Sequence, residues 1–216
     1  MRAWLSKKWL KVPVFLVGLI PIAELVWRMY RQDLGANPVE YITHQTGVWS
    51  LRFLAITLAI TPLRKLLGWP ELIRYRRMTG LFAFFYVWMH FLTYVVLDKM
   101  FDVPEMIKDV LKRPFITAGM TAFVLMIPLA LTSTAGWIRR LGGKRWQLLH
   151  RLVYISAIAG VVHYYWLVKS DVRKPLFYGA LVALLLALRV GFWLSKRHAK
   201  SAGKPLQSKL TTAETA

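Results

Sequence analysis

The chain has 216 residues, of which 56% are hydrophobic and 14% aromatic, and its mean hydropathy of +0.42 excludes an ordinary soluble domain. Its formal net charge of +20 does not indicate nucleic-acid binding, because the basic residues lie at the ends of apolar segments and form no groove-reading motif. The chain has no Cys, which excludes disulfides, zinc–thiolate sites, iron–sulfur clusters and covalent haem attachment.

Six apolar segments approach the length of about 20 residues that a helix needs to cross a bilayer. They cover residues 12–29, 47–66, 79–97, 115–137, 147–168 and 175–194. We therefore predict an all-α integral membrane protein whose six-helix transmembrane bundle forms one domain over residues 12–194. A basic cytoplasmic N-terminus over 1–11 is expected to precede the bundle, and a polar, flexible cytoplasmic tail over 195–216 to follow it.

The first segment starts like a signal peptide, with basic residues before an apolar stretch, but no small-x-small cleavage site follows it. We therefore expect this segment to be retained as the first span. Charged residues also occur inside the segments, at Glu24, Arg52 and Arg189. Charges within a membrane usually pair with one another or line a polar site, and an interhelical ion pair is their commonest explanation.

The basic residues are distributed unequally between the two sides of the membrane that six spans define. The side with both termini carries 18 of the 30 Lys and Arg residues, and the other side carries 9. Acidic residues also lie on the poorer side, at Asp33, Glu40, Asp98, Asp102, Glu105, Asp109 and Asp171. The positive-inside rule therefore predicts that both termini are cytoplasmic.

The longest connection on the outer side covers residues 98–114 and reads DKMFDVPEMIKDVLKRP. This sequence predicts a short amphipathic helix that lies on the membrane surface. The chain has no GxGxxG and no other glycine-rich phosphate loop. It therefore offers no nucleotide-binding domain of the soluble flavin or nicotinamide kind.

Histidines inside the apolar segments are candidate ligands for a metal cofactor. His90 lies past the middle of the third segment, His150 near the start of the fifth, and His163 in the outer half of the fifth. Imidazole binds haem iron axially, and a polar ring within a bilayer needs such a partner or a hydrogen bond to a neighbouring helix. His90 and His163 have the most similar depth, so we rank them first as an axial pair and predict haem between spans three and five.

His150 ranks second among the candidate ligands. On one continuous helix it lies roughly 20 Å from His163 along the axis, which is enough for two haems at different depths. The two side chains then point roughly 140° apart, so the sequence leaves open whether the protein holds one haem or two. His44, in YITHQTG, is expected in a loop and His198 in the basic tail, and both are expected to be solvated or capping residues.

Basic residues flank the candidate ligands. Arg76 and Arg77 precede the third span, and Arg151 follows His150 directly. Guanidinium groups there can pair with haem propionates or with a flavin phosphate. Contact with lipid phosphate is the commoner role of interfacial Arg residues, and this alternative stays open for Arg76 and Arg77.

Three stretches of the sequence together resemble the ferric-reductase-type transmembrane family. They are HQTGVWSLRFLAITLAITPLRK, RRMTGLFAFFYVWMHFLTY and WQLLHRLVYISAIAGVVHYYW, and the resemblance covers roughly residues 10–195. Their combination in a short chain is similar to the branch of this family that supplies the haem-binding membrane subunit of a bacterial methionine sulfoxide reductase system.

The resemblance implies a b-type haem protein of the bacterial inner membrane, with His90, His150 and His163 at the positions of the family's ligands. It implies electron transfer from quinol or a cytoplasmic flavin reductase to a periplasmic molybdenum-containing methionine sulfoxide reductase, with FMN as a further candidate cofactor. The chain is then an electron-transfer subunit and not the catalytic one. Larger relatives have a second pair of ligating histidines, where this chain has Arg76 or Arg77, and a cytoplasmic FAD and nicotinamide domain, which it lacks.

Two other functions are compatible with the same residues. A small proton- or ion-coupled transporter would use His90, His163, Glu24 and Arg189 along a polar path. A structural membrane anchor would need none of these side chains for chemistry. An absorption spectrum separates the alternatives, because a haem protein is coloured and a transporter is not.

Overall fold

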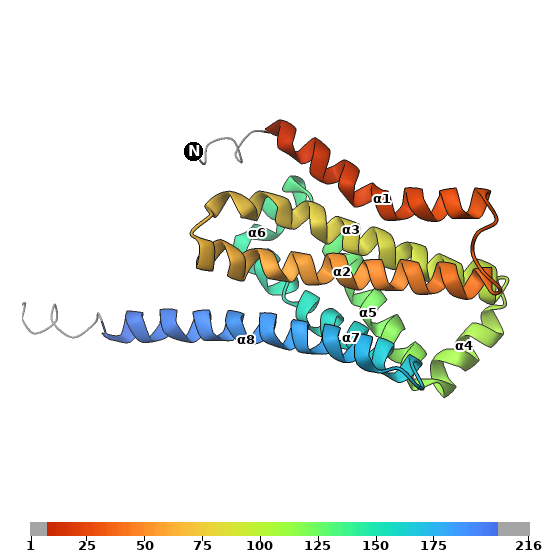
Figure 1. Ribbon diagram of the computed structural model, residues 1–216. Helices are drawn as coiled ribbons and strands as arrows, with labels where there is room; N and C mark the ends of the chain where they lie inside the picture. Colours follow the sequence, from red (N-terminus) through yellow and green to blue (C-terminus); the bar gives the residue numbers. More distant parts are fainter. Residues whose placement is uncertain (1–7, 203–216) are drawn as a thin grey trace, which may run out of the picture.

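The computed structural model describes residues 8–202, and over this range the chain forms helices and no β-strand (Figure 1). The α-helices are α1 Lys11–Tyr30, α2 Pro38–Leu67, α3 Ile73–Leu92, α4 Val103–Lys112, α5 Pro114–Leu131, α6 Ala135–Leu149, α7 Leu152–Leu167 and α8 Arg173–Ala202. Short 3₁₀-helices, η2 Lys8–Leu10 and η3 Pro70–Leu72, precede α1 and α3, and a π-helix, η4 Thr93–Asp98, continues α3. The prediction of an all-α membrane protein is confirmed at this level.

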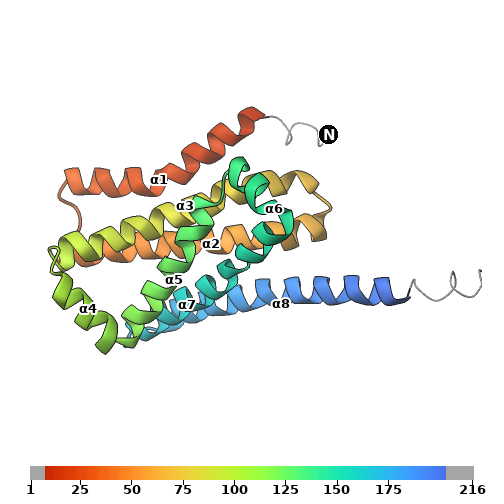
Figure 2. The same ribbon diagram turned by 180° about the vertical axis from the view of Figure 1, so that it is seen from behind.

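The two views show how the helices are arranged. The antiparallel helices α2 and α3 lie between α1 and α8, and α5 and α7 pack behind them (Figures 1 and 2). The start of α1 and the end of α8 lie at one end of the bundle, and α4 lies at the opposite end. The helix predicted within residues 98–114 is therefore present as α4.

The prediction of six spans is met only in part. Five helical stretches are long and apolar enough to cross a membrane, namely Lys11–Tyr30, Pro38–Leu67, Pro70–Asp98, Pro114–Leu131 and Arg173–Arg197. The apolar helix α7 has 16 residues and is shorter than these five. The predicted span 147–168 is divided between α6 and α7, because Arg151 N–H donates to the Leu148 carbonyl and Tyr154 N–H to the Arg151 carbonyl, which tightens the turn.

Other element boundaries also differ from the prediction. Asn37 caps α2 by accepting a hydrogen bond from Glu40 N–H, so α2 starts at Pro38 rather than near residue 47, and His44 is in a helix, not in a loop. The fourth predicted span ends at Leu131 rather than 137, because Thr134 caps a new helix, α6. Helix α8 runs to Ala202 and takes up the start of the expected tail, whereas residues 203–216 and the His198 side chain lie outside the described part.

The core of the bundle fixes the position of α1. Tyr86 is 1% exposed and stacks on Phe53 of α2, with ring centroids 5.3 Å apart. Its hydroxyl donates to the Gly18 carbonyl at 2.8 Å and accepts from Ile22 N–H at 3.2 Å. The hydroxyl thus inserts into the backbone hydrogen bonds of α1 next to Pro21, which explains the bend of that helix.

Candidate functional site

His90 is held against helix α2. It lies in the last turn of α3, and its Nδ1 is 2.9 Å from the Thr43 carbonyl oxygen. One turn further along α2, a Cβ at Gly47 would lie 3.1 Å from Cε1 and Nδ1 of His90. The imidazole therefore rests on the backbone of α2, over a carbonyl and a residue without a side chain.

His163 is held against helix α5 in the same way. It lies on α7, and its Nδ1 is 2.7 Å from the Phe115 carbonyl oxygen near the start of α5. A Cβ at Gly119, again one turn further, would lie 2.6 Å from Nδ1 and 2.9 Å from Cε1 of His163. Any larger residue at Gly119 would displace the ring.

The two imidazoles lie close together. Their ring centroids are 5.9 Å apart and the ring planes make an angle of 75°. Because a carbonyl oxygen can only accept a hydrogen bond, Nδ1 of each ring carries a proton, and in the neutral ring Nε2 then has a free lone pair. Such pairing with a carbonyl is how proteins orient a metal-ligating histidine. The arrangement supplies two neutral nitrogen ligands on different helices.

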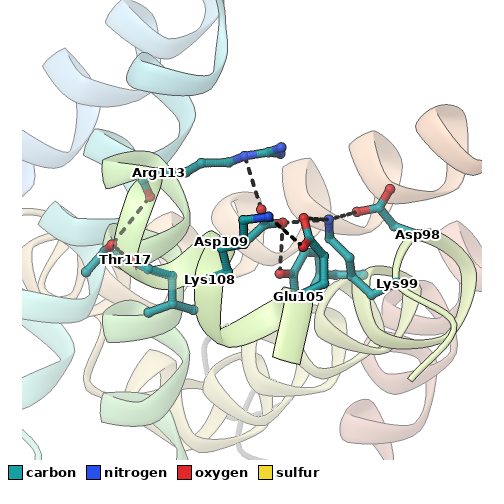
Figure 3. A network of polar contacts seen from close by, with 9 residues as sticks. Asp98, Lys99, Glu105, Lys108, Asp109, Arg113 and Thr117 are labelled. Carbon is teal, nitrogen blue, oxygen red and sulfur yellow. Dashed lines mark hydrogen bonds and ion pairs between the residues drawn. The ribbon is translucent and has the colours of Figure 1, made fainter. Parts of the chain in front are cut away.

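A polar network closes this end of the bundle around α4 (Figure 3). Asp109 of α4 is 2% exposed, and its carboxylate is 2.6 Å from Lys99 Nζ and 3.1 Å from Arg113 Nε. Tyr94 of η4 donates a hydrogen bond to the same carboxylate at 3.3 Å. The network joins η4, which follows His90, to the residues that precede Phe115.

The charges of this network stabilise one another. Burial alone would raise the pKa of Asp109, but the hydrogen bond from Lys99 and the charge of Arg113 outweigh it, so the pKa lies below its usual value. The hydrogen bond to Asp109 also raises the pKa of Lys99. Both groups are therefore ionised at neutral pH. The apolar side chains of α4, such as Ile107 and Leu111, are exposed instead of covering the network.

His44 lies beside the pair but is not part of it. It follows Thr43 on α2 and is exposed. Its Nε2 is 3.5 Å from the hydroxyl of Tyr164, and the two ring centroids are 6.2 Å apart. This exposure fits the prediction that His44 is a solvated or capping residue.

His150 is placed differently from the other two predicted ligands. It follows the last residue of α6, and its Nδ1 is 3.0 Å from the Trp146 carbonyl of its own helix. The ring stacks on Trp146 with a centroid distance of 3.8 Å. Its Nε2 is buried near the Leu129 carbonyl without making a hydrogen bond. No second histidine faces it among the residues that the structure describes.

The predicted basic residues divide into two groups. Arg76 is half-buried, whereas Arg77 and Arg151 are exposed. Arg189, for which an interhelical ion pair was expected, forms no ion pair among the residues that the structure describes.

The charged residues inside the spans do not gather around the histidine pair. Glu24 pairs with Arg28 of the same helix at 3.1 Å, on the exposed side of α1. Arg52 donates to the Tyr178 hydroxyl at 3.0 Å, and Arg189 donates to Tyr154 and to the Leu58 carbonyl. The polar path that a transporter would require is therefore not assembled from Glu24, Arg189, His90 and His163.

The sequence analysis missed four residues of the site. Thr43 and Phe115 orient the two imidazoles through their carbonyl groups, which no side-chain pattern reveals. Gly47 and Gly119 offered a signal, because an isolated Gly inside a helical segment usually has a packing or functional reason. Each Gly follows its carbonyl residue by one helical turn, in THQTG and FITAG.

The fold is that of a helical membrane protein in which two imidazoles from different helices lie close together. Residues 46–161 match the family described as ferric reductase like transmembrane component. This match includes His90 and His150, and the chain belongs to this family. No solved structure matches the chain.

Individual relatives of this chain show to which branch of the family it belongs. A protein of Herminiimonas arsenicoxydans is 54% identical over 89% of this chain and 88% of its own length. One from Ralstonia nicotianae is 48% identical over 92% and 93%, and one from Caulobacter vibrioides is 50% identical over 86% and 88%. Each is named protein-methionine-sulfoxide reductase heme-binding subunit MsrQ. Within the ferric reductase like family, the chain belongs to the MsrQ branch.

Proposed function

We propose that this protein is a haem-binding electron-transfer subunit in which His90 and His163 are the axial ligands of one b-type haem. The observation that carries the proposal is the pair of imidazoles, whose centroids are 5.9 Å apart and whose Nδ1 atoms both point at backbone carbonyls. Metal–imidazole nitrogen bonds are about 2.0–2.1 Å long, so two rings at this separation suit ligation of one iron from opposite sides.

The residues of the site fit such a group in their chemistry. Haem iron alternates between the ferric and ferrous states, which supplies one-electron transfer. The protein would present two neutral Nε2 atoms and keep a proton on each Nδ1. Both rings are held by carbonyl groups of the helix backbone, whose positions the helix fixes. Gly47 and Gly119 allow the rings to reach those carbonyls.

We infer the partners from the names of the relatives and from the resemblance of the sequence. The electron acceptor is a periplasmic molybdenum-containing methionine sulfoxide reductase, MsrP, and the donor is quinol or a cytoplasmic flavin reductase. The protein then lies in the bacterial inner membrane with both termini in the cytoplasm, which the positive-inside pattern supports. His150, with Arg76, Arg77 and Arg151 as candidate partners of anionic cofactor groups, is the candidate place for a second haem or for FMN.

Reduction of the purified protein tests this proposal. Dithionite should reduce a low-spin haem, whereas NADH or NADPH alone should not, because no nicotinamide-binding motif is present in the sequence. Addition of a quinol, or of a flavin reductase with NADH, should reduce the haem, and MsrP with methionine sulfoxide should then reoxidise it. A colourless protein would overturn the haem proposal, and a haem that MsrP cannot reoxidise would overturn only the acceptor.

A further inference from the structure

Helix α4 turns its apolar side chains away from the bundle. Val103, Ile107 and Leu111 follow one another at intervals of four residues, so they form one stripe along the helix, and they are 54%, 57% and 81% exposed. Asp109 lies on the opposite face and is buried against Lys99, 2.6 Å away. A surface helix of a water-soluble protein has the reverse arrangement, with its apolar face inward. The α4 stripe therefore indicates contact with an apolar medium or partner.

The turn before α4 adds two large apolar side chains to this surface. Met100 and Phe101 are exposed, and both have a left-handed backbone, with φ of 47° and 65°. Hydrogen bonds of 2.9 Å hold this conformation, from Phe101 N–H to the Val95 carbonyl and from Asp102 N–H to the Lys99 carbonyl. Bulky residues seldom adopt a left-handed backbone, and where they do the segment often has a function. The turn thus extends the α4 stripe at a conformational cost.

The length of α5 sets the level of α4 relative to a bilayer. Helix α5 is one of the five candidate spans and has 18 residues, which makes it about 27 Å long. The hydrocarbon core of a bilayer is about 30 Å thick, so both ends of α5 lie at the membrane boundary. Arg113 alone separates α4 from α5, and the Thr117 hydroxyl of α5 donates to the Val110 carbonyl of α4. The end of α4 that carries Leu111 is therefore at the level of the lipid headgroups.

The other end of α4 is tied to the same boundary. The candidate span Pro70–Asp98 ends directly before Lys99, which forms the ion pair with Asp109. Helix α4 lies at the end of the bundle, between the end of this span and the start of α5 (Figures 1 and 2). Because two spans fix it at both ends on one side of the membrane, α4 runs close to the membrane plane, where amphipathic helices of the interface lie.

The charges beside the α4 stripe favour a bilayer over the apolar surface of another protein. Lys108 and Lys112 of α4 are exposed, and the ammonium group of Lys108 is 3.5 Å from Glu105 of the same helix. Lysines next to an apolar stripe are typical of interfacial helices, because their ammonium groups reach the phosphates of the headgroups while the stripe contacts the acyl chains.

We propose that α4 is a membrane-interface helix whose stripe, together with Met100 and Phe101, inserts between the acyl chains of the leaflet at this end of the bundle. The sequence predicts only an amphipathic helix at the membrane surface. Which side chains meet lipid follows from the buried Asp109, because its ion pairs with Lys99 and Arg113 fix the rotation of α4 about its axis.

The position of α4 gives this lipid contact a consequence for the histidine pair. Helix α4 is joined to η4, which follows His90, and to the start of α5, where the Phe115 carbonyl orients His163. Insertion of α4 thus anchors the two elements that hold the imidazoles at the membrane boundary. The inference assigns a surface that the proposed function does not use, and it requires no haem.

Spin labels measure the insertion directly. Since the sequence contains no Cys, a single cysteine can carry a nitroxide at Ile107→Cys or Leu111→Cys of the full-length protein. Each form is reconstituted at a low protein-to-lipid ratio into vesicles of phosphatidylcholine and phosphatidylglycerol. Collisions with oxygen, which concentrates among acyl chains, and with a water-soluble nickel chelate give the depth of the label. Lys108→Cys is the control on the same helix, and Val124→Cys is the control at an exposed apolar position inside α5.

Both labels on the stripe should lie about 5–10 Å below the lipid phosphates, as expected for an interfacial helix. They should be shallower than the label at Val124, and the label at Lys108 should lie at the phosphates or outside them. Two positions on the stripe ensure that a disturbance by one label does not decide the result.

The proposal is overturned if the nickel chelate reaches Ile107 and Leu111 as readily as Lys108, because the stripe then faces water. It is also overturned if neither oxygen nor the chelate reaches the stripe, because protein then covers it. Access of the chelate in nanodiscs that hold one chain each would then identify a second copy as the cover. The proposed function is judged separately, by the absorption spectrum of the wild type.

Discussion

The two levels of the bundle that hold the predicted ligands are built differently. At the first level, His90 and His163 come from separate helices. A backbone carbonyl of α2 orients the ring of His90, and one of α5 orients the ring of His163. At the second level, His150 bonds to its own helix and stacks on Trp146. The first level is suited to two ligands on one metal, whereas the second offers a single imidazole.

The largest effect that separates the two levels is expected from removing the ligands. His90→Ala and His163→Ala should each lose most of the low-spin haem, because the remaining imidazole cannot hold the iron from both sides. His150→Ala should alter only a second haem or a reduction potential. Haem per purified chain and the reduced absorption spectrum measure both results.

His44→Ala and His198→Ala are the controls for this comparison, because neither is proposed to ligate iron, and both should keep the wild-type haem content. Full haem retention with an unchanged spectrum in both His90→Ala and His163→Ala would remove the first level as a haem site.

A smaller effect is expected from crowding the rings. Gly119→Ala would place a Cβ 2.6 Å from Nδ1 of His163, and Gly47→Ala one 3.1 Å from Nδ1 of His90. Overpacking costs about 1–3 kcal/mol, which corresponds to a haem affinity that is weaker by roughly 5- to 150-fold. Haem loss to an excess of a haem-scavenging protein should therefore be faster in Gly119→Ala than in Gly47→Ala.

Gly160→Ala is the matched control on α7, because nothing lies within 4 Å of a Cβ at that position. It should lose haem at the wild-type rate. Equal rates for Gly119→Ala and Gly160→Ala would mean that the close approach of α5 does not position His163.

The polar network at α4 should affect stability more than cofactor binding. Asp109→Asn should lower the stability at neutral pH by about 1.5–3 kcal/mol, because it removes a charged hydrogen-bond acceptor that Lys99, Arg113 and Tyr94 share. The pKa of Asp109 is below its unfolded value, so its stabilisation is complete above that value and is lost as the pH falls through the folded pKa.

Thermal unfolding in detergent at a series of pH values measures this effect. The difference in melting temperature between the wild type and Asp109→Asn should be largest near pH 7 and should shrink below about pH 4. A difference that does not change with pH would show that the charge of Asp109 contributes nothing. Lys108→Gln, at an exposed neighbour on α4, should change little at any pH.

Much of the first level could be predicted from the sequence. His90 and His163 stand out because imidazoles are rare in long apolar segments, and their similar depth follows from counting residues along the spans. Their partners could not be predicted, because carbonyl groups are present at every residue and only packing selects those of Thr43 and Phe115. The same holds for Gly119, whose importance depends on how closely α7 approaches α5.

The second level was harder to predict, for two physical reasons. The estimate of the angle between His150 and His163 assumed one continuous helix, whereas the chain breaks at His150 and Arg151. Distances along the sequence also hide contacts between helices. Arg189 is far from Leu58 and Tyr154 in sequence, and only the packing of α8 against α2 and α7 brings it to them.

The most direct test of the central claim is the low-temperature electron paramagnetic resonance spectrum of the ferric protein, recorded with haem per chain for the wild type, His90→Ala, His163→Ala and His150→Ala. The account predicts that His150→Ala keeps the low-spin signal of an iron with two imidazole ligands. Its haem content should be at least one haem per chain. Loss of that signal in His150→Ala, with its retention in His90→Ala or His163→Ala, would contradict the assignment of the axial pair.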